Sequence, residues 1–236
     1  YEFLVIFPLP PARLANYREA VTTSGAKDDP TDANLLWDYL VRHRDRLVAW
    51  KPDEPLTREI ALLAETRRGA VNLRTSLGNQ LKAALKGYFP QALAMVGETV
   101  HSSMACAFLM KWITPEQLQR AQPRTVRKFY YSENCRSESR IKERLEIAKN
   151  LVPLTADSAI INSSLAKVRM LVAQLRPLNK SIAALDEALA RLMQEHPDAA
   201  LYVDLPGAGD ALAPRLLAAF GDDRDRMDSP ASMQCL

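Results

Sequence analysis

The stretch INSSLAKVRMLVAQLRPLNKSIAALDEALARL, residues 161–192, decides the fold of this chain. In each half of it, apolar residues alternate steps of four and three, at Ile161, Leu165, Val168, Val172, Leu175, Leu178, Ile182, Leu185, Leu189 and Leu192. This is the heptad spacing of a coiled coil. Two three-residue steps meet around Pro177, which predicts a kink or a break there. The partner is either another helix of this chain or the same helix of a second copy.

A second long amphipathic helix is predicted from residue 53 to residue 86. Its apolar residues recur at helical spacing, at Leu56, Ile60, Leu63, Ala70, Leu73, Leu77, Leu81 and Leu85. Gly87 is expected to end it. The opposite face is basic, with Arg58, Arg67, Arg68, Arg74, Lys82 and Lys86. Such a one-sign series is either a solvated surface or a stripe that follows nucleic-acid phosphates.

The composition agrees with a mainly α fold. The chain has 236 residues, of which 47% are hydrophobic and only 8 are glycine. Its net charge of +3 permits nucleic acid as a partner without demanding it. No apolar run approaches the roughly 20 residues of a membrane span, and the three cysteines are expected to be reduced thiols of a cytosolic protein. The three histidines are too far apart in sequence to indicate a zinc site.

The first 46 residues predict one strand and two helices. The apolar run from Glu2 to Phe7 is rich in β-formers and predicts a buried strand. A helix over 12–21, a loop over 22–27 and a helix over 30–46 follow. Because one strand cannot make a sheet, we expect its partners upstream of this chain, in an α/β domain that is truncated here.

Two carboxylates lie three residues apart at the start of the helix that begins near Pro30. Asp29 and Asp32 share a helical face, and Lys27 precedes them. Magnesium takes one or two carboxylates together with waters and substrate phosphates, so the pair predicts an Mg²⁺ site. The alternative is structural, because aspartates at a helix start also cap free N–H groups and complement the dipole.

Two further segments are candidates for binding nucleic acid. The first is a basic and aromatic cluster of Arg124, Arg127, Lys128, Phe129, Tyr130, Tyr131, Arg136 and Arg140. Its rings either stack on bases or pack inward beneath solvated cations. The second is the turn Leu205-Pro206-Gly207-Ala208-Gly209, which precedes a predicted helix over 211–220. Backbone N–H groups at Gly207 and Gly209 can approach a phosphate there, as in a helix-hairpin-helix motif; the alternative is an ordinary turn.

In this order, the motifs Ala26-Lys27-x-Asp29-x-x-Asp32-Ala33, the basic helix, the interrupted coiled coil and the Leu205–Gly209 turn resemble the DEDD-type transposases of the insertion-sequence-110 group. The resemblance implies a RuvC-like domain whose quartet of acids binds magnesium, with Asp29 and Asp32 as its last two members. It implies recombination of DNA guided by a structured bridge RNA, a homodimer or higher homo-oligomer, and a serine nucleophile in the C-terminal domain. It places such a protein in the bacterial cytoplasm, at the nucleoid.

The resemblance divides the chain into residues 1–52 as the end of the RuvC-like domain, 53–197 as the helical section, and 198–236 as the start of the C-terminal transposase domain. The quartet's first Asp and its Glu are expected before residue 2, and the serine beyond residue 236. Neither Ser229 nor Ser232 is assigned that role. The chain alone is therefore expected to be inactive. The alternatives are a catalytically dead relic that binds nucleic acid or dimerises, and a nuclease of Holliday-junction type.

Overall fold

The computed structural model describes residues 3–22 and 28–223 of the chain. The chain forms two compact units. Among the described residues, one takes in 3–22, 28–54 and 222–223, and the other consists of Pro55–Gly221. The predicted boundary between residues 197 and 198 falls inside the second unit. The mainly α fold is confirmed, because every element found in the described residues is a helix.

The first unit is built on two helices, α1 (Pro11–Val21) and α2 (Asp29–His43), followed by the short 3-10 helix η1 (Arg44–Arg46). Ring contacts join the helices: the centroids of Tyr17 and Tyr39 are 4.9 Å apart, edge to face. The Tyr17 hydroxyl also donates a hydrogen bond of 2.6 Å to the Asp38 carboxylate. Leu35 is the one hydrophobic side chain that is buried in the described part of residues 3–54.

The strand predicted from Glu2 to Phe7 is wrong over the described residues 3–7. They form no ladder, and Leu4, Val5 and Ile6 are exposed. A backbone hydrogen bond of 2.7 Å, from the Trp50 N–H to the Ile6 carbonyl, joins the segment to the residues that follow α2. An apolar run becomes a buried strand only where other strands pair with it, and the described residues offer none.

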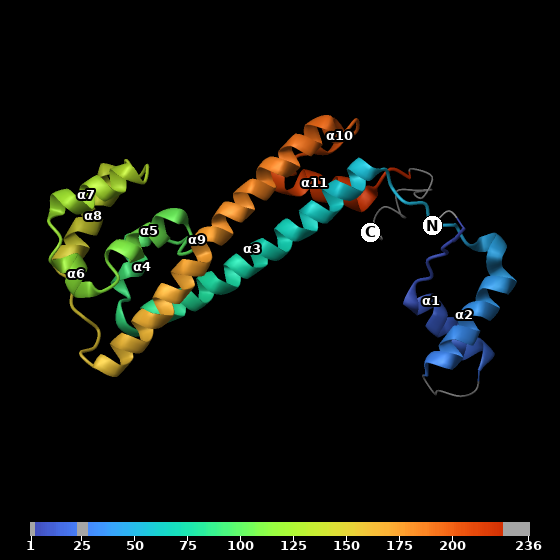
Figure 1. Ribbon diagram of the computed structural model, residues 1–236, viewed down its shortest axis with the longest axis horizontal. Helices are drawn as coiled ribbons and strands as arrows, with labels where there is room; N and C mark the ends of the chain where they lie inside the picture. The colour runs from blue at the N-terminus through green and yellow to red at the C-terminus, as the bar shows by residue number, and fades with distance from the viewer. Residues whose placement is uncertain (1–2, 23–27, 224–236) are drawn as a thin grey trace. The chain divides into compact units, whose positions relative to one another are not determined.

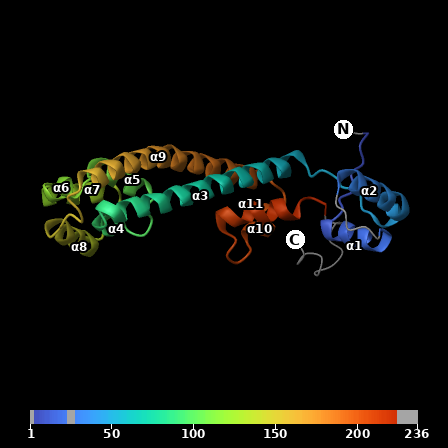
Figure 2. The same cartoon turned by 90° about the horizontal axis from the view of Figure 1, so that it is seen from below.

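The second unit is organised by two long helices, α3 (Pro55–Tyr88) and α9 (Ser158–Glu195). They lie side by side along most of their length (Figures 1 and 2). All the predicted heptad positions of α9 are buried or half-buried. The chain therefore supplies the partner of its own heptad helix, and a dimer seam stays a prediction. At its start, the Asp157 carboxylate caps α9 by accepting the Ala159 N–H at 2.8 Å.

Five short helices pack between the end of α3 and the start of α9. They are α4 (Gln91–Val96), α5 (Ser103–Lys111), α6 (Pro115–Gln119), α7 (Pro123–Ser132) and α8 (Glu138–Lys149). They bury a large apolar core with the adjoining halves of α3 and α9, in which Phe89, Phe108 and Leu171 are fully buried. Thr114 caps α6, because its Oγ1 accepts the Gln117 N–H at 3.3 Å.

At the other end of the long helices, α10 (Ala199–Val203) and α11 (Gly209–Phe220) pack against α3 and α9. A smaller core joins them, with Ile60 from α3, Leu189 from α9 and Leu217 from α11. A buried polar contact lies here as well: Thr57 Oγ1 and His196 Nε2 are 2.9 Å apart. Because His196 Nδ1 accepts the Asp198 N–H, its Nε2 carries the proton and donates to Thr57.

Three details of the long helices differ from the sequence predictions. Gly87 does not end α3, which continues to Tyr88. Leu73 is 53% exposed although it fits the apolar spacing. Pro177 does not break α9, which runs through it. A proline costs a helix one hydrogen bond, and the buried residues on both sides of Pro177 hold α9 in one piece.

Cys106 and Cys135 are both free thiols. No helix in the described residues is long and apolar enough to cross a membrane.

Candidate metal site and nucleic-acid interface

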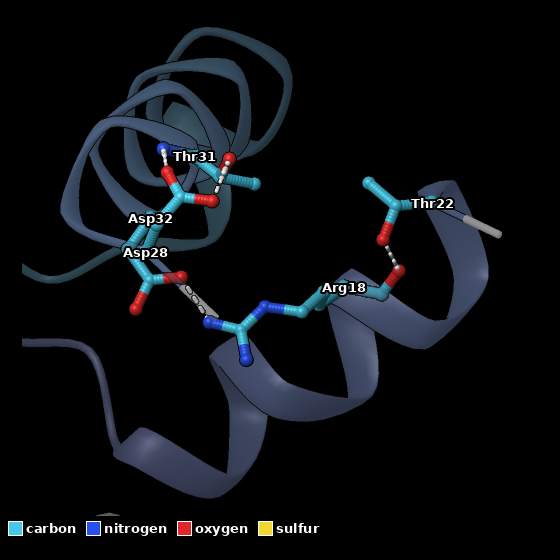
Figure 3. A network of polar contacts seen from close by, with 5 residues as sticks. All are labelled: Arg18, Thr22, Asp28, Thr31 and Asp32. Carbon is cyan, nitrogen blue, oxygen red and sulfur yellow. Dashed lines mark hydrogen bonds and ion pairs between the residues drawn. The ribbon is translucent and has the colours of Figure 1, made fainter. Parts of the chain in front are cut away.

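The start of α2 is organised by Asp28, a residue to which the sequence analysis gave no role. Its carboxylate accepts two hydrogen bonds from Thr31, one of 2.9 Å from the backbone N–H and one of 2.8 Å from the hydroxyl (Figure 3). The hydrogen bond from the Thr31 amide, above all, lowers the pKa of Asp28 below its ordinary value. Asp28 is therefore the cap, so the capping role weighed for Asp29 and Asp32 belongs to their neighbour, while both lie in the first turn, where an acid complements the helix dipole.

Asp32 forms an ion pair with Arg18 of α1 (Figure 3). Both side chains are largely withdrawn from solvent, at 17% exposure for Arg18 and 27% for Asp32. The pair holds the Asp32 carboxylate in one place and gives it a positive partner. Sequence reasoning missed Arg18, because nothing in a linear pattern joins a cation of one helix to an acid of another.

Asp29 is exposed at the first turn of α2 and makes no ion pair within the described residues. Lys27, which precedes it, lies outside the described residues. No group of three or more His, Cys, Asp or Glu side chains in the described part of the chain is arranged to hold a metal ion. The predicted pair thus offers one open carboxylate, that of Asp29, and one carboxylate paired with a guanidinium, that of Asp32.

The basic series of α3 is divided between different surroundings. Arg67 forms an ion pair with Asp186 of α9, and Arg68 lies 3.9 Å from Glu65. Arg74 lies beside His101, whose pKa is lowered by burial and by that guanidinium.

The Nε atom of Arg74 is buried without a hydrogen-bond partner. Lys82 is exposed and has no carboxylate partner within residues 3–22 and 28–223. The series is therefore not one uniform stripe, and its exposed members without an ion pair within the described residues are Arg58, Lys82 and Lys86.

In the cluster around α7, the rings and the cations separate. Phe129 is 6% exposed and Tyr130 is fully buried, where its hydroxyl donates to the Met95 carbonyl at 2.9 Å. These two rings pack inward and cannot stack on bases, so for Phe129 and Tyr130 the inward-packing alternative is confirmed. Arg127 pairs with Glu138 at 3.0 Å, while Arg124 and Lys128 are exposed.

The turn between α10 and α11 has the backbone that its glycines predict. Gly207 has φ of +82° and Gly209 has φ of +52°, both in the left-handed region that glycine tolerates. The Ala208 N–H closes the turn on the Leu205 carbonyl at 3.0 Å. No side chain caps the N-terminus of α11, so its first N–H groups stay available, although Asp210 in the first turn opposes an anion.

An acidic pair at a helix start, exposed cations and a glycine turn before an uncapped helix start are typical of proteins that act on nucleic-acid backbones. Residues 2–90 match the family model of the DEDD-type transposases of the insertion-sequence-110 group, whose description is transposase. The chain belongs to this transposase family.

A curated relative agrees with this family. It comes from Streptomyces coelicolor (strain ATCC BAA-471 / A3(2) / M145), carries the name "Mini-circle putative transposase for IS117", and is 30% identical over 247 residues. The alignment takes in 97% of this chain and 56% of the relative, so the chain spans about half the length of that protein. No solved structure matches the chain.

Proposed function

We propose that this chain works in DNA transposition as part of an insertion-sequence transposase. The observation that carries the proposal is the family match over residues 2–90, because that segment contains the acidic pair at the start of α2. The first unit then corresponds to the end of a RuvC-like domain. The helical section and the α10–α11 turn correspond to the parts that hold nucleic acid.

The acidic pair fits magnesium in its donor atoms but not as a complete site. Asp29 and Asp32 supply the hard oxygen ligands that Mg²⁺ prefers. Bound there, the ion would polarise a DNA phosphodiester for attack. The ion pair with Arg18 orients Asp32, and Asp29 remains open for a ligand. The two other acids of the family's quartet are not carried over to any residue of this chain.

Nucleic acid is the proposed partner of the exposed cations and of the turn. Lys82, Arg124 and Lys128 would neutralise phosphates of DNA or of a structured guide RNA, and the amides around Gly207 and Gly209 would contact the backbone. Sequence choice would then come from base pairing with the guide, because none of these groups reads a base edge. A homodimer would bring two DNA ends together.

The metal assignment is tested by adding Mn²⁺, as a paramagnetic substitute for Mg²⁺, to the isotope-labelled protein. We expect the amide signals of residues 28–33 to broaden, and we expect Asp29→Asn with Asp32→Asn to abolish this effect. Asp45→Asn, which removes an exposed acid of η1, is the matched control. Equal broadening in the double variant and the control would show that Asp29 and Asp32 are not metal ligands. The proposed binding of nucleic acid would be unaffected by that result.

A second candidate function is a catalytically inactive protein that binds nucleic acid or dimerises. Two observations favour it: Asp32 is already neutralised by Arg18, and the described residues hold no cluster of three metal-ligating side chains. The two functions separate in a strand-exchange assay with purified DNA. The inactive protein would bind DNA with an affinity that falls steeply with salt, and would give no metal-dependent products.

A further inference from the structure

A groove with a volume of about 730 Å³ lies between α9 and the segment from α5 to α6. Four cations line it: Lys111 of α5, and Arg169, Arg176 and Lys180 of α9. The three α9 residues are spaced by seven and four, so they lie on one face of the helix. All four side chains are exposed, and none pairs with a carboxylate within the described residues.

The groove has no acid among its lining residues. In α9, no Asp or Glu occurs between Ser158 and Leu185, although this segment carries several cations. The nearest acid in sequence to the lining residues of α6 is Glu116, which does not line the groove. Cys106, close to Arg176, adds no negative charge either, because burial raises the pKa of its thiol to about 11. The lining of the groove is therefore positive, with no acid among its own residues to offset the four cations.

The floor of the groove is apolar. Ile113 and Val172 are buried there, and Met110 is 60% exposed at the edge. The Met110 sulfur lies 3.0 Å from an Nη atom of Arg176, so an apolar thioether adjoins a guanidinium group. A flat ring can lie on such a surface, since a polarizable thioether and a guanidinium both make good contacts with aromatic faces.

Pro177 adds one polar feature to this floor. Because proline has no N–H, the carbonyl of Ala173 loses the hydrogen bond that a helix would give it from residue 177. Ala173 and Pro177 both line the groove. An acceptor is therefore available beside the apolar surface, suited to a base amino group.

We propose that this groove binds one unstacked nucleotide of a single-stranded nucleic acid, with the base on the apolar floor and the flanking phosphates on Arg169, Arg176 and Lys180. A duplex keeps its base faces stacked and would leave the floor empty, whereas a single strand can place a ring there. The groove rests on the proposed function in one respect, that the protein binds nucleic acid. It adds a site made of residues that no motif of the family match includes, since that match ends at residue 90.

The test compares two triple variants of the whole chain that remove equal charge. Arg169→Gln with Arg176→Gln and Lys180→Gln empties the groove of its α9 cations. Lys142→Gln with Lys149→Gln and Arg191→Gln removes three exposed cations that do not line it. Fluorescence anisotropy follows binding of labelled oligonucleotides of about 15 nucleotides, as uridine RNA, thymidine DNA and duplex DNA, at rising salt.

We expect the groove variant to bind the single strands roughly tenfold or more weakly than the control variant, with a salt slope lower by about two. Duplex binding should change equally in both variants. The uridine and thymidine arms decide whether the strand is RNA or DNA. A 4-thiouridine probe should cross-link to the segment 109–113 or 169–180 in the unaltered chain.

The remaining outcomes overturn the inference, and each does so in a distinguishable way. Equal weakening in the two triple variants means that only total charge matters, and then the proposed nucleic-acid binding stands without the groove. Equal loss of duplex and single-strand binding in the groove variant makes the groove a general phosphate contact. If the unaltered chain binds none of the three probes, both the groove and the proposed binding of nucleic acid fail.

Discussion

Different interactions stabilise the interior of each of the two compact units. Residues 55–221 bury two apolar cores, whereas the described part of residues 3–54 buries one hydrophobic side chain, Leu35. In the first unit, large apolar side chains remain in solvent, with Trp37 69% and Val48 74% exposed. Its helices are joined instead by rings, by the Tyr17–Asp38 hydrogen bond and by the Arg18–Asp32 ion pair.

This difference matters because the proposed metal ligands lie on the unit with the smaller core. Directional polar contacts fix the angle between two helices but add little free energy when they are partly exposed. The proposed nucleic-acid contacts after residue 54 lie instead on helices anchored by buried apolar side chains. The contrast predicts that the acids move more easily than the phosphate contacts do.

The largest expected effect compares one leucine from each unit. Leu81→Ala removes a fully buried side chain of α3 and should lower the free energy of unfolding of its unit by about 3–5 kcal/mol. Leu35→Ala should cost less than about 2 kcal/mol, because few apolar neighbours lose a contact there. Urea unfolding with hydrogen exchange read separately for each unit measures both. Equal losses would contradict the difference between the units.

A polar contact inside the well-packed unit should have the next largest effect. His196→Ala leaves the buried Thr57 hydroxyl without the ring that now donates to it, at a cost of about 1–3 kcal/mol. Thermal unfolding monitored by circular dichroism measures the loss. His196→Gln, whose amide can still donate, is the control, and it should recover part of the stability. If His196→Ala lowered the stability no more than a substitution of an exposed residue does, the contact between Thr57 and His196 would not contribute to the stability of the unit.

Two glycines of α3 test how tightly the well-packed unit is filled. A Cβ at Gly78 would lie 2.9 Å from Nδ1 of His101, whereas at Gly69 it would have no neighbour within 4 Å. Gly69→Ala should therefore stabilise the protein by about 0.5–1 kcal/mol through helix propensity. Gly78→Ala should destabilise it by about 1 kcal/mol, because the imidazole must shift. We expect the two substitutions to change the free energy of unfolding, measured with urea, in opposite directions. A change in the same direction for both would mean that the His101 side chain can move aside at little cost.

The smallest effect concerns the polar contacts of the first unit. The Tyr17 hydroxyl, followed by Arg42, lowers the pKa of Asp38. A lowered pKa in the folded state stabilises the unit above the ordinary carboxyl pKa, and this stability is lost as pH falls through the lowered value. Tyr17→Phe should raise the pKa of Asp38, as measured by NMR titration of its carboxyl group. Asp28, whose pKa depends on Thr31, is the internal control and should not change.

Periodicity predicted the long helices because apolar spacing and burial follow the same geometry. It also located α1, α2 and α11, whose starts carry proline or an acidic cap or whose end carries glycine. It failed for residues 3–7, since a run of β-formers specifies a strand only together with its partners. Leu73 failed for a related reason: spacing shows which residues share a face but not how far a neighbouring helix covers it.

The candidate sites were predicted only where one segment contains them. Asp29 and Asp32 are neighbours in sequence, and so are Gly207 and Gly209. Arg18 was missed because its contact joins two helices, and the groove was missed because α5 and α9 meet only in the fold. One signal was present in the sequence, the long segment of α9 with cations and no acids. In the sequence alone this segment indicates an ordinary solvated face, because the groove forms only where residues 109–117 pack against α9.

The continuity of α9 through Pro177 makes the helix a ruler. Between Arg176 in the groove and His196 at its C-terminal end, a rise of 1.5 Å per residue gives a separation of about 30 Å, close to the length of nine base pairs. The same 20 positions set the angle, because each added residue would turn one end by about 100° relative to the other. An insertion of one residue would therefore rotate the groove at Arg176 relative to the end of α9 at His196. An insertion of seven residues would move the two apart with little rotation.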